Sequence, residues 1–205
     1  IREIGKSEGW SEVRILDAGC GEGSHLAWIW RDLKAKKTGF ADLTGVGIDL
    51  SKEGIRVAAK EHRDIIWCVA DLTKLPLQNQ QFDLVLNILS PANYGEFKRV
   101  LKEHGILVKL LPTADYLIEL RELLFKGTDK ELYENDSVKK HFANSFQLVK
   151  EQQINYKVLL KEENLEHLIK MTPLTWNADQ EKIAMIINSG LKSITVAFDL
   201  LVGKK

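Results

Sequence analysis

The stretch Ile15-Leu16-Asp17-Ala18-Gly19-Cys20-Gly21-Glu22-Gly23 decides the fold class of this chain. Its first residues are apolar and predict a buried β-strand, which reaches an acid at Asp17 and then breaks into alternating glycines. Glycine at every second position lets the backbone turn tightly and lets a ligand lie against bare main chain. A helix with apolar spacing follows at once. The segment therefore has the strand, glycine loop and helix that open nucleotide-binding α/β domains.

The spacing of the loop indicates which nucleotide cofactor binds. The glycines follow the pattern G-x-G-x-G with an Asp just before it, whereas dinucleotide-binding loops follow G-x-G-x-x-G. This difference favours S-adenosylmethionine (SAM) over NAD. We expect main-chain N–H groups of the loop and of the next helix to bind the methionine end of SAM, while Asp17 receives its ammonium group. The predicted contacts in this segment are Asp17, Gly19, Gly21, Gly23, His25 and Leu26.

Three further apolar runs, each ending in polar residues, predict the next strands at 45–49, 65–69 and 82–89. Asp49 closes the first of them, where an acid hydrogen-bonds ribose hydroxyls in folds of this kind. Asp71 follows the second and can accept a hydrogen bond from the exocyclic amine of adenine. The residues predicted to line SAM at these strand ends are Asp49, Leu50, Asp71, Leu72 and Asn87.

Taken in order, these strand ends resemble those of the class I SAM-dependent methyltransferases. The resemblance implies an α/β, Rossmann-like fold with a mostly parallel seven-stranded sheet and helices on both faces. A fifth strand is expected at 106–111, and alternating apolar residues predict two late strands at 154–160 and 194–202. One helix is expected after Asp115, a candidate N-cap. The other predicted helices span 52–61, 94–102, 163–171 and 179–188.

We expect one sizeable domain from the 205 residues of the chain. Residues 1–12 are predicted to be a polar lead-in, truncated at its start because the chain begins with Ile1. Residues 13–205 form the methyltransferase domain, in which 126–190 contains the substrate-side elements and a polar segment. That segment, 126–145, shows no apolar period and is interpreted either as mobile surface or as a lid.

Composition restricts the class of protein further. The 29 Lys and Arg residues balance 29 Asp and Glu, whereas a domain that binds nucleic acid unaided usually has a basic excess. Any RNA would therefore be held by another module or by a local patch, for which the candidates are lysines 34, 36, 37, 139 and 140, although such runs are most often solvated. The two cysteines indicate neither a disulfide framework nor a metal site, and no apolar run reaches the length of a membrane span. We expect a cytoplasmic protein with no membrane partner.

Several segments point to a narrower family. They are LDAGCGEG at 16–23, GIDLSKEGIRVAAK at 47–60, Ser90-Pro91 with EFKRVLK at 96–102, LLPTADYLIELRELLF at 110–125 and MTPLTW at 171–176. Through them the chain resembles the catalytic domain of the bacterial large-subunit (23S) rRNA guanine-N(1) methyltransferases of the RlmA type. The first two segments are shared by many methyltransferases, whereas the last two are much more particular to this family.

The resemblance implies methyl transfer from SAM to N1 of a guanine in large-subunit rRNA, and it is compatible with a homodimer. The family also carries an N-terminal four-cysteine zinc module that would grip the rRNA, so we expect zinc only in a missing module and no metal in this chain. The family commonly has a histidine where Tyr116 stands, which makes Tyr116 either a SAM contact or a core aromatic. Lys102-Glu103-His104-Gly105 stands where the family usually has a Pro-Gly-Gly turn.

Guanine N1 bears a proton at neutral pH, so an acceptor near the methyl group must take or orient that proton. The loop after the fourth strand is where such groups lie in this fold, which nominates Asn87, Ser90 and the carbonyls around Pro91; the other interpretation is a structural strand-end turn. Trp176 and Thr172 are the candidate substrate contacts, because a flipped base could stack on the indole. The alternative for Trp176 is a place in the core between the late helices and the sheet.

Two other functions fit the same motifs. One is methylation of a small molecule, which the shared motifs and the zero net charge permit. The other is a SAM-binding or resistance-associated module without turnover. The rRNA interpretation is preferred because segments 110–125 and 171–176 are the ones least shared with other methyltransferases.

Overall fold

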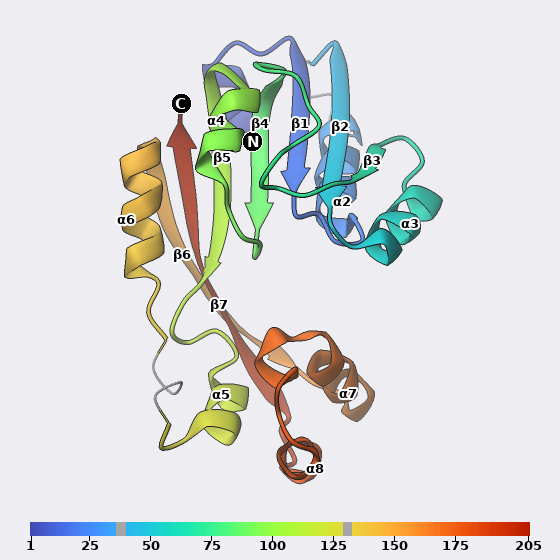
Figure 1. Ribbon diagram of the computed structural model, residues 1–205, viewed down its shortest axis with the longest axis vertical. Helices are drawn as coiled ribbons and strands as arrows, with labels where there is room; N and C mark the ends of the chain where they lie inside the picture. The colour runs from blue at the N-terminus through green and yellow to red at the C-terminus, as the bar shows by residue number, and fades with distance from the viewer. Residues whose placement is uncertain (36–39, 129–132) are drawn as a thin grey trace. The chain divides into compact units, whose positions relative to one another are not determined.

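The computed structural model describes residues 1–35, 40–128 and 133–205 of the chain (Figure 1). In these residues a seven-stranded sheet has the order β3-β2-β1-β4-β5-β7-β6. Its strands are β1 (Glu12–Ala18), β2 (Asp42–Asp49), β3 (Ile66–Val69), β4 (Phe82–Ile88), β5 (Leu101–Pro112), β6 (Gln147–Leu159) and β7 (Ser193–Lys204). The helices are α1 (Arg2–Ser7), α2 (Ser24–Ala35), α3 (Lys52–Glu61), α4 (Tyr94–Val100), α5 (Ile118–Phe125), α6 (Asp136–Ser145), α7 (Glu162–Met171), the 3-10 helix η1 (Pro173–Thr175) and α8 (Gln180–Asn188).

The central strand of the predicted site is β1. It pairs in parallel with β2 on one side and β4 on the other, so Asp17 lies between Gly47 and Leu86. The pairs β2 with β3 and β4 with β5 are parallel as well, so the first five strands run in one direction. The carboxyl ends of parallel strands meet at the same edge of a sheet, which is where α/β folds bind ligands. The predicted SAM residues at the ends of β1 to β4 are thereby brought to one edge.

The chain divides into two compact units. The first contains residues 1–110, 140–151 and 201–205, and the second contains 111–139 and 152–200. The strands β5, β6 and β7 each contribute residues to both units, so no linker marks the division in the sequence.

The core of the first unit packs α2 against one face of the sheet. Leu26 of α2 is fully buried in a cluster with Ile15 of β1 and Leu84 of β4. The residues that follow these two in their strands, Leu16 and Val85, point to the opposite face and are also fully buried. Both faces are therefore covered, as a nearly continuous apolar strand predicts for a parallel sheet. Each such side chain contributes about 1.5–3 kcal/mol through burial.

Residues 1–12 lead into β1, which begins at Glu12, and they contain a helix that the sequence analysis did not predict. They contain helix α1, and both Ile4 and Trp10 pack against the core cluster of the first unit. Glu8 forms an ion pair with Lys204 of β7 at 2.7 Å, which ties this segment to the last strand. Helix α1 has only six residues, most of them polar or charged, so the sequence shows no apolar period there.

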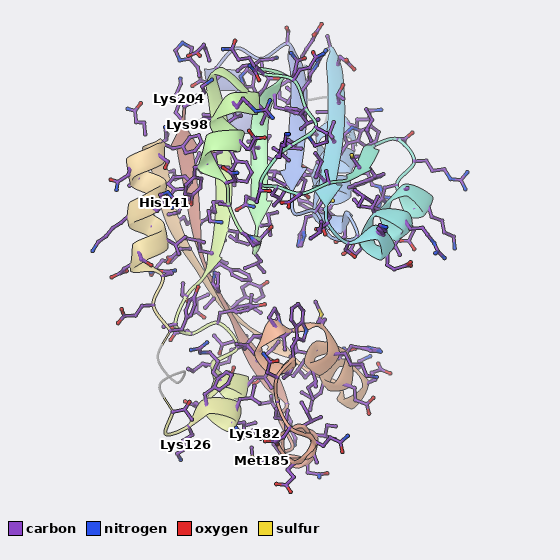
Figure 2. All side chains as sticks on the ribbon, in the orientation of Figure 1. Lys98, Lys126, His141, Lys182, Met185 and Lys204 are labelled. Carbon is purple, nitrogen blue, oxygen red and sulfur yellow. The ribbon has the colours of Figure 1, made fainter. Side chains whose placement is uncertain are left out.

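The polar segment 126–145 also differs from its prediction as mobile surface or a lid. Residues 136–145 form α6, and Phe142 is fully buried against the rings of Tyr94 and Phe146, with centroids 6.0 and 5.9 Å away. His141, labelled on α6 in Figure 2, places its ring 4.8 Å from that of Tyr94. Phe142 is the buried residue that anchors this helix. A single buried residue leaves no apolar period that could be recognised in the sequence. Residues 129–132 of the segment lie outside the described residues.

The second unit gathers α5, α7, η1 and α8 around its own apolar cluster. Leu120, Leu165 and Ile186 are buried there, one from each α-helix. Asp115 does not cap α5 with its side chain, contrary to expectation. The N-cap position is Leu117, which has a left-handed φ of 53°, and no side chain caps it among the described contacts.

Candidate cofactor and catalytic site

The glycine loop after β1 has a left-handed backbone at three positions, with φ of 85° at Gly19, 56° at Gly21 and 82° at Gly23. Any other residue would be strained there. At Gly21 no described atom lies within 4 Å of the place where a Cβ would stand. The Cα side of Gly21 is therefore open to an approaching ligand, while its carbonyl lies close to Gly54 of α3.

The other end of the loop is packed by an aromatic ring. A Cβ at Gly23 would lie 2.3 Å from the Trp67 ring, and one at Gly47 would lie 2.1 Å from it. The indole donates a hydrogen bond from Nε1 to the carbonyl of His62 at 2.9 Å, which fixes its orientation. Gly23 and Gly47 are thus needed to make room for Trp67, a reason that the motif alone does not reveal.

Asp49, at the end of β2, joins the loop to the next helix. Its Oδ2 accepts a hydrogen bond from the N–H of Gly21 and its Oδ1 accepts one from the N–H of Ser51, both at 2.8 Å. Ser51 caps α3 as predicted, because its Oγ accepts from the N–H of Gly54 at 3.1 Å. A carboxylate oxygen has two acceptor positions, so Asp49 keeps capacity for ribose hydroxyls while it orders the loop.

Asp17 is the most unusual group of the site. It is 1% exposed, and neither carboxylate oxygen has a hydrogen-bond partner among the described residues. Burial, and secondarily the nearby charges of Asp49 and Glu22, raise the pKa of this carboxyl to about 7. A buried acid without a partner is costly, and a cationic ligand would relieve that cost.

The residues of the first unit fit SAM. The methionine end of the cofactor carries an ammonium group, for which Asp17 offers two unengaged acceptor atoms. The open Cα side of Gly21 and the acceptor capacity of Asp49 suit the rest of the molecule. These residues would hold SAM at the ends of β1 and β2.

The predicted adenine contacts follow β2 and β3. Leu50 is 71% exposed and Leu72 is half-buried, with a methyl group 3.7 Å from where a Cβ of Gly19 would stand. Asp71 is exposed and its Oδ1 accepts from the N–H of Thr73 at 2.8 Å. This backbone hydrogen bond, with one from the Thr73 side chain, lowers the pKa of Asp71, so the carboxylate is charged and ready to accept. Adenine recognition by these residues stays a prediction.

His25 and Leu26 begin α2 but differ in what they can reach. His25 is exposed and free to meet a ligand, whereas Leu26 has no exposed surface and belongs to the core. Only the main chain of Leu26 is left as a contact, because its side chain is enclosed by the sheet.

The turn after β4 is fastened from within by a residue that the sequence analysis missed. Lys109 of β5 is 2% exposed, and its Nζ donates to Asn87 Oδ1 and, at 3.1 Å, to the Ser90 carbonyl. Asn87 in turn donates to the carbonyls of Ala18 at 2.9 Å and Pro91 at 3.0 Å. Burial lowers the pKa of Lys109 to about 8. A lysine inside an otherwise apolar strand was the signal that could have revealed it.

These contacts bear on the predicted proton acceptors. Asn87 is fully buried and uses its amide and its oxygen within the protein, as the structural-turn interpretation expects. The carbonyls of Ser90 and Pro91 already accept hydrogen bonds from Lys109 and Asn87. The half-buried Ser90 hydroxyl faces the glycine loop, since a Cβ at Gly19 would lie 1.9 Å from its Oγ. Of the three nominated residues, Ser90 is therefore the one that offers a side chain at the loop.

Tyr116, Thr172 and Trp176 belong to the second unit. Tyr116 packs its ring 5.0 Å from that of Phe198, beside the apolar cluster, which favours the core-aromatic interpretation. Thr172 is buried and its hydroxyl accepts from the N–H of Leu174 at the start of η1. Trp176 is 69% exposed, so its interpretation as a core residue is wrong.

The lysines that the sequence offers as candidate RNA contacts have different surroundings. Lys34 lies 3.9 Å above the Trp30 ring, Lys139 pairs with Asp199 at 2.8 Å, and Lys140 is exposed. Lysines 36 and 37 lie outside the described residues. Among the described residues no group of His, Cys, Asp and Glu could hold a metal ion, and no helix has the length and apolarity to cross a bilayer.

The sequence matches the family model described as a methyltransferase domain over residues 10–183. YcgJ from Bacillus subtilis shares the fold with a TM-score of 0.60 at 18% identity, over 99% of this chain and 96% of YcgJ. A SAM-dependent methyltransferase from Methanosarcina mazei does so with a TM-score of 0.59 at 14% identity, over 95% of this chain and 93% of that one. The fold and the site thus define a class I SAM-dependent methyltransferase.

The family within this class follows from two relatives. YxjB of Bacillus subtilis, provisionally named a 23S rRNA (guanine-N(1)-)-methyltransferase, is 40% identical over 197 residues, which cover 96% of this chain and 68% of YxjB. The 23S rRNA (guanine(748)-N(1))-methyltransferase of Streptomyces fradiae is 27% identical over 186 residues, covering 89% of this chain and 64% of that protein. The chain belongs to the family of these rRNA guanine-N(1) methyltransferases, and it spans about two thirds of their length.

Proposed function

We propose that this chain transfers a methyl group from SAM to N1 of a guanine in large-subunit rRNA, and that it acts in the cytoplasm. The observation that carries the proposal is the 40% identity to YxjB over 96% of the chain. The relative from Streptomyces fradiae, whose name specifies N1 of guanine 748, supports the same reaction.

On the cofactor side, each residue has a physical task. Asp17 receives the ammonium of SAM, the open Cα side of Gly21 makes room for the methionine end, and Asp49 accepts from the ribose hydroxyls. Bound SAM supplies a methyl group on a sulfonium, which is already a good electrophile. The protein therefore contributes by orienting the two reactants and by excluding water.

On the acceptor side, the proposal assigns Ser90 and Trp176. The Ser90 hydroxyl lies against the glycine loop and can orient the N1 proton of guanine, whereas Asn87 and the neighbouring carbonyls are engaged internally. The exposed indole of Trp176 offers a stacking platform for a base. Thr172 supports the segment that presents Trp176, since its hydroxyl begins the 3-10 helix η1.

The test is nucleoside mass spectrometry of large-subunit rRNA from the source organism, with and without the gene. We expect one N1-methylguanosine to disappear on deletion and to return when the gene is restored. A gene carrying Ser90→Ala serves as a second arm and should restore the modification only in part. Unchanged N1-methylguanosine after deletion would contradict the proposal.

Methylation of a small molecule is the second candidate. It is favoured by the formal net charge of zero, which gives the chain no overall attraction to RNA. It also agrees with the 30% identity, over 105 residues covering 50% of this chain, to a phthiotriol/phenolphthiotriol dimycocerosates methyltransferase of Mycobacterium tuberculosis. Methyl transfer from labelled SAM into small-molecule extracts, with no transfer into rRNA, would favour this candidate.

A further inference from the structure

The turn after β4 is held by one buried ammonium group. In the parallel register of β4 and β5, Asn87 stands directly beside Lys109, and the two side chains are 0% and 2% exposed. Lys109 donates hydrogen bonds to the Asn87 side chain and to the Ser90 carbonyl. The Asn87 amide in turn donates to the carbonyls of Ala18 and Pro91. Ala18 directly precedes the glycine loop. The ammonium and Asn87 together therefore tie the end of β1 to Ser90 and Pro91 of the turn.

The turn that this network holds is strained. Leu89 has a left-handed φ of 51° although it is not glycine, and its side chain is 45% exposed. Its N–H donates to the Leu110 carbonyl at 3.2 Å. Such a conformation costs about 1–3 kcal/mol and persists only where the surrounding structure imposes it. Lys109 supplies that constraint from inside, and the result is that Ser90 lies against Gly19.

Stability does not explain a lysine at this position. Removing an ammonium group from water is costly, and an apolar residue of similar volume usually serves a core strand equally well. Burial accordingly lowers the pKa of Lys109, with no opposite charge among its causes. A buried charge beside a strained turn at the ligand edge of the sheet indicates a role in function.

We propose that Lys109 is a positioning residue for methyl transfer, which holds the Leu89–Pro91 turn against the glycine loop and thereby sets where the methyl acceptor lies. Lys109 itself is enclosed and touches neither reactant. Its effect passes through Asn87 and the Ser90 carbonyl to the Ser90 hydroxyl. A loss of this constraint displaces the acceptor rather than the cofactor, since Asp49 holds the glycine loop through the N–H groups of Gly21 and Ser51 and neither bond involves Lys109.

The experiment compares Lys109→Met, Lys109→Gln and the control Lys102→Met. Lys102 lies on the same strand and also has a polar partner, Asp83 at 2.8 Å, but it is remote from the turn. We expect Lys109→Met to lower kcat for rRNA methylation about 10- to 100-fold, because small displacements of reacting groups have effects of this size. The Kd for SAM, measured by calorimetry, should change less than twofold. Lys109→Gln should be intermediate and Lys102→Met should leave kcat unchanged.

A readout independent of the acceptor separates this proposal from the proposed function. Hydrogen exchange of peptides covering 85–92 should quicken in Lys109→Met and not in Lys102→Met. If the wild-type protein methylates no rRNA, the proposed function fails, and the exchange of this turn still tests the role of Lys109. Unaltered kcat and exchange in Lys109→Met would overturn the proposal. A loss of SAM affinity and thermal stability in step with kcat would also overturn it, because that pattern indicates a purely structural lysine.

Discussion

At the scale of single residues, the site is distinguished by hydrogen-bond acceptors and open space that the free protein leaves unoccupied. Asp17 is buried with no hydrogen-bond partner among the residues that the structure describes, and Gly21 leaves open space at its Cα in a left-handed conformation. Asp49 has the opposite character, because both of its oxygens already order the loop. In the free protein Asp17 is thus available to a ligand, whereas Asp49 orders the loop where we propose that SAM binds.

Asp17→Asn should make the free protein more stable at high pH. The carboxyl has a pKa of about 7 in the folded state against a usual 3.8. Asp17 therefore destabilises the folded protein fully above about pH 7, and it does not do so below about pH 4. At high pH this raised pKa lowers the free energy of unfolding by on the order of 4 kcal/mol. Urea unfolding at pH 8 and pH 5 should show the variant gaining most at pH 8.

The same substitution should weaken SAM binding, because the ammonium of SAM loses a charged acceptor. Binding to the wild type should release a proton near pH 7 and strengthen as pH rises through 7, since a cation favours the ionised carboxyl. Calorimetry in buffers of different ionisation enthalpy measures this proton. Equal SAM affinity in Asp17→Asn and wild type would contradict the assignment.

Gly21→Ala should abolish or strongly reduce SAM binding, and Gly9→Ala is its matched control. Both glycines have a left-handed φ, 56° and 66°, with no described atom within 4 Å of a new Cβ. Each alanine should therefore cost a similar 1–2 kcal/mol of stability. Only the methyl group at position 21 lies where the cofactor would approach. Equal SAM affinity in the two variants would show that the loop does not bind SAM through Gly21.

At the scale of elements, what the sequence could predict depended on how strongly each element is patterned. The apolar runs of β1 and β4 and the cap at Ser51 were readable because burial and capping leave local signals. Helix α6 was not readable, since a single aromatic, Phe142, anchors it. Lys109 was missed for a related reason: its partners come from another strand, and no local rule pairs a strand lysine with them.

Phe142→Ala should destabilise the protein by about 3–5 kcal/mol, because it removes a fully buried ring from a cluster with Tyr94 and Phe146. Lys140→Ala, on the exposed side of α6, should change the free energy of unfolding by less than about 0.5 kcal/mol. Chemical denaturation measures both values. A near-neutral Phe142→Ala would instead support the mobile-segment interpretation.

At the scale of the whole molecule, the balanced charge sets how a large anion can be recognised. With 29 basic and 29 acidic residues, the chain has no general attraction to phosphate, so specific contacts must supply affinity. The exposed indole of Trp176, in the second unit, is the contact that we propose for a base.

Trp176→Ala should weaken rRNA binding by about 1–3 kcal/mol, the usual value of a base stacked on an aromatic ring. Trp28→Ala is the matched control, because Trp28 is equally exposed, at 69%, but lies on α2 in the first unit. Filter binding with a large-subunit rRNA fragment compares them, and SAM affinity should be unchanged in both. Equal rRNA binding by the two variants would remove Trp176 from the acceptor site.

The packing of Trp67 beneath the glycine loop has an optical consequence. Its indole touches the main chain of Gly23 and Gly47 from one side, while the loop at Gly21 is open to a ligand. A ligand that covers the loop changes the polarity around this ring, so the intrinsic fluorescence of the protein should report cofactor occupancy without any label. Trp67→Phe should remove most of that signal, whereas Trp28→Phe should retain it. The residue that shapes the loop thus makes its occupancy visible in real time.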